Sequence, residues 1–409
     1  MGAPADLDPT FGDGGKVLTN VVRRAELHDV AMAPDGKIVA VGGTVLQNED
    51  IHSSNPDRSF YAVVRYNPDG SLDSSFNGDG KWLQGFTLAG DGQAAVAVAI
   101  QSDGKVVFAG TGAPTRFPSI VVFRLNVDGT LDNSFNGNGY QIVQQTGALL
   151  FPTDIALQPD GKILVAGQKG KDALVVRLNP DGELDDSFDG DGMASANFGA
   201  LSLAQALAIQ PDGKIVIAGT LFLSSPGINH TDIAVARFNQ NGSLDPSFEG
   251  DGKLTYDMGT SEFSAALAIQ ADGKIVVLGN GGFDFSLLML RLNLDGSLDS
   301  SFDGDGVVQT PRKFATDAKI QPDGKIVVAG QTGPFEPFAA GRYNPDGSLD
   351  TSFGVNGFVT TSFSSEGIGL ARRVVIQADG KIVVAGDLET GDKQQNIHAD
   401  FALARYLGN

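Results

Sequence analysis

Cysteine is absent from this chain, so neither a disulfide nor a thiolate metal site nor a cysteine nucleophile can exist. Positive charge is scarce: Lys and Arg number 29 against 49 Asp and Glu, which leaves a formal net charge of −20. Nucleic acids and anionic membranes bind basic surfaces, so we expect no nucleic acid as a partner. No apolar run approaches the roughly 18 residues of a membrane span, so we expect no membrane insertion.

Glycine, by contrast, is abundant: 54 Gly and 18 Pro indicate many tight turns between short strands. The tripeptide Asp-Gly-Lys recurs seven times. Residues 206–219, ALAIQPDGKIVIAG, show its setting, in which two apolar runs flank a Pro-Asp-Gly turn and predict a β-hairpin of strands a and b. The seven copies begin at Asp35, Asp103, Asp160, Asp212, Asp272, Asp323 and Asp379.

A third apolar run in each repeat predicts strand c and ends in an arginine, as in FYAVVRYNPDG at residues 60–70. A turn of the type SLDSSFNGDG and a short run such as KWL follow and predict strand d. Four strands per repeat, with a period near fifty residues or more, indicate a propeller blade. We therefore predict one all-β domain over residues 1–409, a seven-bladed β-propeller with four antiparallel strands per blade. The seven arginines in register are Arg65, Arg124, Arg177, Arg237, Arg291, Arg342 and Arg405.

The two ends of the chain complement each other. The chain opens with a turn and a d strand that have no blade before them, and it closes with a c strand that has no d strand after it. We expect the N-terminal strand at residues 16–19 to pair with the strand around residues 401–406, because a closed ring exposes no sheet edges. Strand a, often rich in Ala, is predicted to be innermost, where space is least.

The segments QPDGKIVVAG, RYNPDGSLD and SFxxxG resemble the delta-60 repeat, a bacterial propeller-forming repeat of uncharacterised function. The resemblance covers almost the whole chain. It implies a bacterial protein that is secreted or on the cell surface. The N-terminal residues lack a basic region followed by an apolar one, so we expect that a secretion signal would have been removed. The resemblance implies no catalytic residues.

The repeats predict two faces with different properties. The a–b and c–d turns are nearly constant and acidic, and we call their side the constant face. The b–c and d–a connections vary in length, and we call their side the variable face, where a repeat protein commonly binds ligands. We predict the ligand-binding site there, among every His and every Arg outside the register set. These candidates are Arg23, Arg24, His28, His52, Arg58, Arg116, His230, Arg312, Arg372, Arg373 and His398.

Three kinds of ion site have alternatives that need no ligand. Asp69, Asp73 and Asp79 offer oxygen ligands that suit calcium, but the spacing is not that of an EF-hand, and ordinary turn residues explain the pattern equally. His28, His52 and His398 lie near the junction of the last and first blades, where they could form a zinc site or be ordinary surface histidines, and no HExxH motif or short ligand pair accompanies them. The arginine pairs Arg23–Arg24 and Arg372–Arg373 could hold a carboxylate or sulfate, or could simply be solvated. Apart from calcium, we expect no cofactor.

The register arginines and the Phe of each SFxxxG turn are predicted to be structural. An ion pair between each Arg and the Asp of LDxSF would join strand c to the following turn, and each Phe would fill the space between blades. For catalysis we find no GxSxG, P-loop or GxGxxG motif in a suitable setting.

Three functions remain open. The first is a monomeric, non-enzymatic binding module for a glycan, peptide or protein on the variable face. The second is a hydrolase or lyase with a central-channel active site. The third is a structural segment of a longer surface protein. An axial pocket lined by charged groups from three or more blades would favour the enzyme. Exposed aromatic side chains would favour binding, and the candidates are Phe117, Phe222, Phe283, Phe285 and Phe335.

Overall fold

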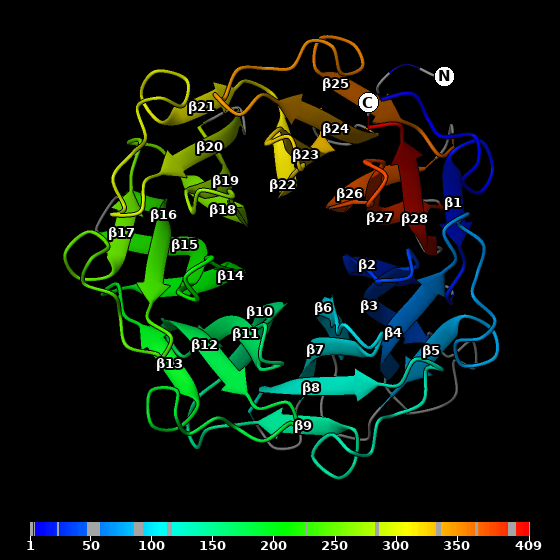
Figure 1. Ribbon diagram of the computed structural model, residues 1–409, viewed down its shortest axis with the longest axis horizontal. Helices are drawn as coiled ribbons and strands as arrows, with labels where there is room; N and C mark the ends of the chain where they lie inside the picture. The colour runs from blue at the N-terminus through cyan, green and yellow to red at the C-terminus, as the bar shows by residue number, and fades with distance from the viewer. Residues whose placement is uncertain are drawn as a thin grey trace.

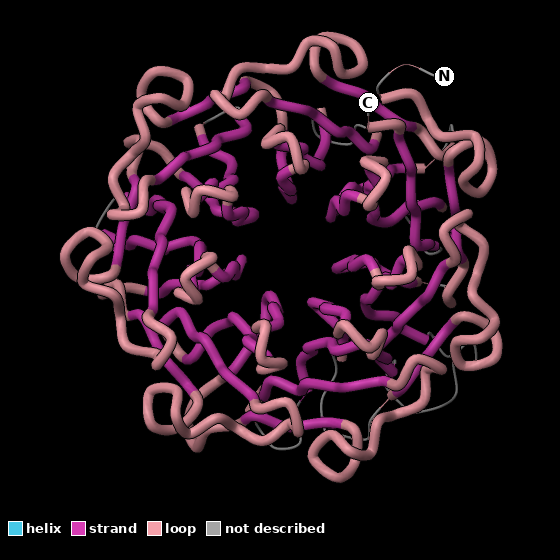
Figure 2. The backbone as a smooth tube through the Cα atoms, viewed as in Figure 1, coloured by secondary structure: helices cyan, strands magenta, loops and turns pink. Residues whose placement is uncertain are grey.

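Seven four-stranded sheets surround a central axis in the computed structural model, and each sheet radiates from that axis (Figure 1). The structure describes residues 3, 5–22, 24–46, 58–85, 93–112, 117–225, 228–282, 286–332, 337–364, 367–391 and 398–408. All strand pairs are antiparallel, and the described residues contain strands and turns without helices (Figure 2). The predicted seven-bladed propeller is therefore confirmed.

The described residues accordingly contain no helix that could span a membrane. Blades 1 to 6 each use four consecutive strands, beginning with β2–β5, and blade 7 combines β26, β27 and β28 with β1. The innermost strands, a, are β2 (Ala25–Met32), β6 (Ala94–Ile100), β10 (Leu150–Leu157), β14 (Leu201–Ile209), β18 (Glu262–Ile269), β22 (Phe314–Ile320) and β26 (Ile368–Ile376).

The other three positions in each blade follow outward from the axis. The b strands are β3 (Ile38–Leu46), β7 (Val106–Gly112), β11 (Ile163–Lys169), β15 (Ile215–Ser225), β19 (Ile275–Gly281), β23 (Ile326–Gln331) and β27 (Ile382–Thr390). The c strands are β4 (Arg58–Tyr66), β8 (Ser119–Leu125), β12 (Asp172–Leu178), β16 (Ile228–Phe238), β20 (Ser286–Leu292), β24 (Phe338–Tyr343) and β28 (His398–Tyr406). The outermost d strands are β5 (Lys81–Gln84), β9 (Tyr140–Val143), β13 (Met193–Ala196), β17 (Lys253–Tyr256), β21 (Val307–Thr310), β25 (Phe358–Thr361) and β1 (Lys16–Thr19).

The ring closes as the sequence predicts. Strand β1 pairs with β28, with Lys16 opposite Ala404 and Thr19 opposite Phe401, so the two ends of the chain share blade 7 (Figure 1). The backbone amide of Arg405 also donates to the carbonyl of Gly15. These hydrogen bonds satisfy the edge of β28 that an open array would expose.

The core lies between the blades. Each hydrophobic cluster joins two neighbouring sheets: one of them brings Ala62 and Val64 of blade 1 against Val383 and Leu403 of blade 7. Strand b is apolar on consecutive residues because both of its faces are covered. The phenylalanines of the c–d turns are fully buried in these clusters, which agrees with the predicted space-filling role. They are Phe11, Phe76, Phe135, Phe188, Phe248, Phe302 and Phe353.

Ion pairs at the constant face confirm the structural role of the register arginines. Arg65 Nε lies 2.7 Å from Asp73 Oδ2, and the guanidinium lies 4.5 Å from the centre of the Phe76 ring. Nη1 of Arg65 donates to the carbonyl of Val127 in the next blade. The same ion pair and ring contact recur in all seven repeats, so this face is fixed by its own side chains.

Candidate functional site

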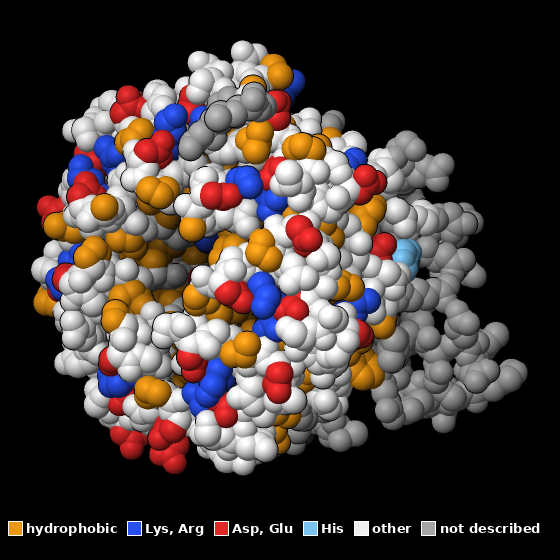
Figure 3. All heavy atoms as spheres, turned by 45° about the vertical axis from the view of Figure 1, so that its right-hand side comes forward, with side chains coloured by type: hydrophobic (Ala, Val, Ile, Leu, Met, Phe, Trp, Pro, Cys, Tyr) orange, Lys and Arg blue, Asp and Glu red, His pale blue; other side chains and the backbone are white. Residues whose placement is uncertain are grey.

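A pocket on the propeller axis gathers polar side chains from five blades. Its volume is about 260 Å³. Apolar residues of the inner strands, such as Leu207 and Val375, complete its wall. Figure 3, which views the molecule obliquely from the side of the constant face, shows the hollow at the ring centre with hydrophobic side chains around its mouth. The polar lining residues are Asp29, Asp154, Gln205, Asp317, Lys319 and Arg373.

Four of these residues occupy the same position of the repeat, directly after a bulge in the inner strand, and Gln205 and Lys319 lie within two residues of that position. Each inner strand contains a β-bulge, in β2 between Leu27 and Asp29 and in β10 between Pro152 and Asp154. A bulge redirects the side chains that follow it. Directly after the bulge stand Asp29, Asp154, Asp317 and Arg373 in blades 1, 3, 6 and 7, whereas the other three blades carry Ala97, Ala206 and Ala266.

The three aspartates join neighbouring blades. An innermost strand is a sheet edge, so its axial amides need partners from outside the sheet. Asp29 Oδ2 accepts from the amide of Val98 in blade 2 at 2.8 Å, and Asp154 Oδ2 accepts from Leu207 in blade 4 at 2.7 Å. In the same way, Asp317 Oδ2 accepts from the backbone amide of Val374 in blade 7 at 2.9 Å. These bonds hold the carboxylates in fixed orientations around the pocket.

Among the described residues, two of the three axial aspartates form an ion pair with a cation of the pocket, and the third does not. Arg373 Nε lies 3.2 Å from Asp29, and Lys319 Nζ lies 3.2 Å from Asp317. Asp154 forms no ion pair among the described residues. Its Oδ1 and Oδ2 accept from the backbone amides of Ile155 and Leu207. Burial, and next the charge of Asp29, therefore raise the pKa of Asp154 to about 6.

Lys319 is the accessible cation of the pocket. Its side chain is 46% exposed, against 26% for Arg373. Desolvation lowers the pKa of Lys319, but the charges of Asp317, Asp29 and Asp154 outweigh that effect, and the pKa is raised. Lys319 is therefore charged at neutral pH and is free to contact a ligand.

Three sequence candidates lie inside inner strands and not in the variable loops where we predicted them. His28 occupies the bulge of β2, and its Nδ1 lies 2.9 Å from the carbonyl of Ala95 in blade 2. Burial lowers the pKa of His28. Arg372 lies 2.9 Å from the fully buried Asp387, and Arg373 faces the axis. The loop placement was wrong because a strand interrupted by a bulge and charges resembles a connection in sequence.

The remaining described candidates do reach the variable face, although not all in loops. His230 and His398 lie near the starts of the c strands β16 and β28, which begin on that face. Arg24 precedes β2 and lies 3.6 Å from Glu26, and Arg312 has a left-handed backbone, with φ of 56°, in the turn between β21 and β22. Whether any of them binds a ligand stays a prediction.

Some predicted positions fall outside the described residues. They are Arg23, His52 and Arg116, together with Phe283, Phe285 and Phe335. Arg58 begins strand β4, but its side chain lies outside the described part as well. Of the two other aromatic candidates, Phe117 is 40% exposed and Phe222 is half-buried.

The acidic turns have partners within the protein. Asp73 accepts from Arg65 and from the amide and hydroxyl of Ser75, and it lies 3.4 Å from Lys37. Asp69 accepts from the amide and hydroxyl of Ser71, and Asp79 accepts from the amide of Lys81. These bonds support the structural explanation of the turns, and calcium binding stays an untested prediction.

Sequence reasoning missed Asp29, Asp154, Asp317 and Lys319. A usable signal was present, because the residue six positions before the Asp of each Asp-Gly-Lys is charged in blades 1, 3, 6 and 7 and is Ala in the other three. Charged residues inside an apolar inner strand indicate an axial position once the repeats are aligned. The repeats therefore need to be compared for their differences as well as for their common pattern.

The family is shown by seven matched segments. They match the family described as a domain of unknown function (DUF5122) beta-propeller, and the chain belongs to it. The matched residues are 53–76, 101–135, 158–188, 210–248, 270–302, 321–353 and 377–409. No curated protein matches the sequence.

Solved structures share the fold. A virginiamycin B lyase from Staphylococcus aureus is 11% identical, with a TM-score of 0.54, over 95% of this chain and 98% of that one. A protein of unknown function from Dyadobacter fermentans is 11% identical, with a TM-score of 0.51, over 98% and 100%. The polysaccharide lyase Uly1 is 11% identical, with a TM-score of 0.52, over 96% and 99%. At this identity the likeness concerns the fold alone.

Proposed function

We propose that this protein is a non-enzymatic binding module that takes a neutral, hydroxyl-rich ligand of about the size of one sugar unit at its axis. The convergence of carboxylates, a lysine, an arginine and a carboxamide from five blades in one pocket carries this proposal. Sugar hydroxyls both donate and accept hydrogen bonds, so they suit a wall that offers both kinds of group. A secreted or surface location remains part of the proposal.

The charge of the pocket favours a neutral ligand. Three carboxylates face two cations, and the whole chain carries a net charge of −20, so an anionic ligand is repelled. Exposed apolar side chains lie at the variable-face ends of three inner strands, at Leu201, Phe263 and Phe314, each between 36% and 38% exposed. Such side chains suit the apolar faces of sugar rings, which supports entry from the variable face.

A binding experiment with matched lysine variants tests the proposal. Neutral oligosaccharides are titrated into the protein by calorimetry, beside the Lys319→Met variant and a Lys171→Met control whose exposed lysine lies on the variable face, away from the pocket. We expect the Lys319→Met variant to bind about tenfold more weakly and the control to bind normally, because a lost charged hydrogen bond is worth about 1.5 kcal/mol or more. Equal affinities in both variants, or no binding of any neutral saccharide, would overturn it.

A second candidate function is glycoside hydrolysis in the same pocket. Charged groups from four blades meet in the pocket, as expected of a central-channel enzyme, and the pKa of Asp154, raised to about 6, suits a general acid near the working pH. Binding is preferred because each axial carboxylate is held by a backbone amide of the next blade. A lyase that acts on uronates is less favoured, since its substrate is anionic. Release of new reducing ends by the wild-type protein, abolished in Asp154→Asn, would replace the binding proposal with this one.

A further inference from the structure

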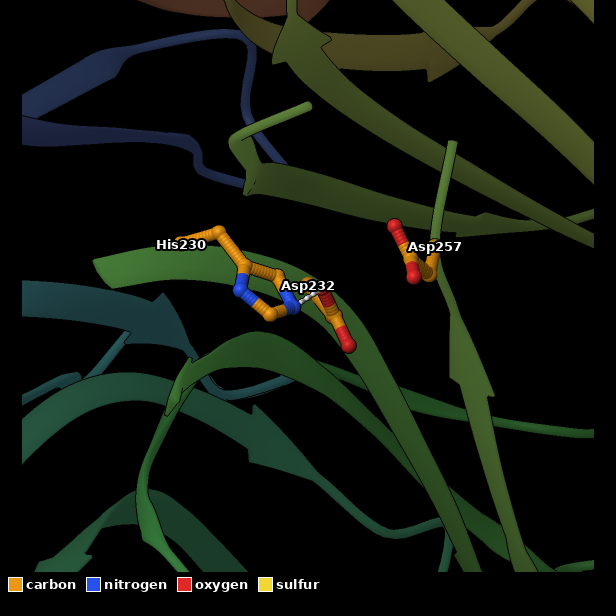
Figure 4. A group of neighbouring side chains, drawn as sticks. All are labelled: His230, Asp232 and Asp257. Atoms are coloured by element: carbon orange, nitrogen blue, oxygen red, sulfur yellow. Dashed lines mark ion pairs between the residues drawn. The ribbon is translucent and has the colours of Figure 1, made fainter. Parts of the chain in front are cut away.

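A corner of blade 4, far out from the axis, gathers three metal-binding side chains. His230 and Asp232 lie on strand β16, and Asp257 follows strand β17 directly. One ligand atom from each of the three lies within 4.8 Å of the other two. Figure 4 shows the imidazole of His230 beside Asp232, with Asp257 across from them on the neighbouring segment. The corner belongs to the variable face, where strand c begins and strand d ends.

Asp232 is the unusual member of this group. Its side chain is 4% exposed, and its Oδ1 accepts no hydrogen bond. Nε2 of His230 lies 3.5 Å from that oxygen, and the buried Nδ1 of His230 is also without a hydrogen-bond partner. Buried carboxylate oxygens are normally satisfied, so this oxygen has room for a further partner.

The surrounding charges point to a cation as that partner. The carboxylate of Asp257 places a second negative charge within 4.8 Å of the Asp232 carboxylate. Glu262, which is fully buried, adds further negative potential at Asp232. Among the residues that the structure describes, no Lys or Arg forms an ion pair with any of these three carboxylates. A divalent cation would supply the compensation that the protein does not.

Blade 7 offers a built-in comparison. His398 and Asp400 precede Arg405 by seven and five residues, as His230 and Asp232 precede the register arginine of blade 4. The pairing of Thr19 with Phe401 places Asn20 next to Asp400, where blade 4 has Asp257. The amide nitrogen of Asn20 lies 2.8 Å from Nε2 of His398. Oδ1 of Asp400 likewise accepts no hydrogen bond. Blade 7 differs because the amide of Asn20 occupies the imidazole nitrogen that a metal would need, and because Asn20 lacks the negative charge of Asp257.

We propose that His230, Asp232 and Asp257 bind a divalent transition-metal ion such as Zn²⁺, with water in the open coordination position. One imidazole and two carboxylates form a ligand set that suits Zn²⁺, and together they neutralise its charge. Ligand atoms around Zn²⁺ stand about 3.3 Å apart in tetrahedral geometry, so the three side chains must close slightly. Asp257 is exposed, and Oδ1 of its carboxylate accepts from the amide of Gly259, so a small rotation of the side chain can bring its other oxygen inward.

Metal titration of the full chain tests this site. The protein is treated with EDTA, desalted and titrated with ZnCl2 by calorimetry, and Co²⁺ is added in parallel to follow its visible absorption. We expect one saturable equivalent of Zn²⁺ per chain and a Co²⁺ spectrum typical of a site with a nitrogen ligand. The Asp257→Asn variant, which gives blade 4 the residues of blade 7, and the His230→Gln variant are each expected to bind at least about tenfold more weakly.

Two controls make the result decisive. The His398→Gln variant should bind Zn²⁺ as the wild-type protein does, and the melting temperatures of the EDTA-treated Asp257→Asn and wild-type proteins should agree, because Asp257 is exposed. Absence of saturable binding would overturn the proposal. So would binding that survives both blade 4 variants, or binding that is lost only in His398→Gln.

Discussion

The pKa values of aspartates shift in opposite directions at two places in this propeller: at its axis, and at its rim, by which we mean the c–d turns where each register arginine pairs with an aspartate. At the rim, burial opposes ionisation of Asp73, but hydrogen bonds from Ser75 and the charges of Arg65 and Lys37 lower its pKa to about 2. At the axis, Asp154 accepts hydrogen bonds from two backbone amides and has no cationic partner among the described residues, so burial and Asp29 raise its pKa to about 6.

Repetition explains this contrast. The rim aspartate occurs once in every blade and is always paired with an arginine, so each copy serves the common purpose of joining a strand to a turn and to the next blade. The axial aspartates occur in three blades, and their surroundings differ from one to another. Residues that depart from the repeat are not required by every blade, so they are the better candidates for function.

The largest effect is expected at the rim. Arg237→Ala removes an ion pair of 2.7 Å with Asp245, in which both side chains are at most 5% exposed, and a contact with the Phe248 ring. Asp245 keeps Lys214 at 3.0 Å, but it loses its buried arginine. The hydrogen bonds of Arg237 to Leu294 and Ser247 are lost as well. We therefore expect a loss of about 3 kcal/mol in the free energy of unfolding, at the lower end for a broken buried ion pair. Chemical denaturation followed by circular dichroism measures this loss.

The matched control for that variant is Arg24→Ala. Arg24 is 40% exposed and lies 3.6 Å from the exposed Glu26, so its loss should cost less than about 1 kcal/mol. A similar, small loss in the two variants would show that the rim pairs contribute no more than surface ion pairs.

A smaller effect is expected at the axis, and it depends on pH. The folded pKa of Asp154, about 6, lies above the ordinary value of 3.8. The folded wild-type protein therefore gains stability as the pH falls from 7.5 to 5 and Asp154 binds a proton. An Asp154→Asn variant lacks this gain. We expect its stability relative to the wild type to be more favourable at pH 7.5 than at pH 5, by about 1 kcal/mol.

Melting curves of both proteins at the two pH values test this expectation. Asp387, whose pKa burial also raises to about 6, is present in both proteins, so its contribution cancels. A stability difference that is the same at pH 5 and pH 7.5 would mean that Asp154 titrates as an ordinary carboxyl group.

The smallest effect on stability is expected for Lys319→Met. Its side chain is 46% exposed and its ion pair with Asp317 is accessible to water, so we expect a change below about 0.5 kcal/mol. Since the charge of Lys319 lowers the pKa of Asp154, the same variant should raise that pKa further. A carboxyl ¹³C titration by NMR measures the shift, and a downward shift would contradict the proximity of the two groups.

The fold could be predicted almost completely, whereas the axial pocket could not. Hairpin turns, apolar runs and the register arginines are local patterns that recur seven times, and the pairing of residues 16–19 with residues 401–404 follows from counting strands. The position of Arg373 was predicted only as part of a variable loop, because a bulge in β26 cannot be recognised from one repeat. The sequence did not predict Asp257 as a site residue, because only the pairing of β16 with β17 brings it close to His230.

The repeated residues thus define the blades and their number, because in blades 1 to 6 each strand pairs with the next strand along the chain. The closure follows from counting strands, since the last blade lacks one strand and the N-terminus supplies it. Only the closed ring determines which of the residues that differ between repeats lie close together in space. Asp29, Asp154 and Lys319 lie in three different blades, and they share a pocket because seven inner strands converge on one axis. The burial and the charge of Asp29 that raise the pKa of Asp154 are therefore properties of the assembled ring and of no single repeat.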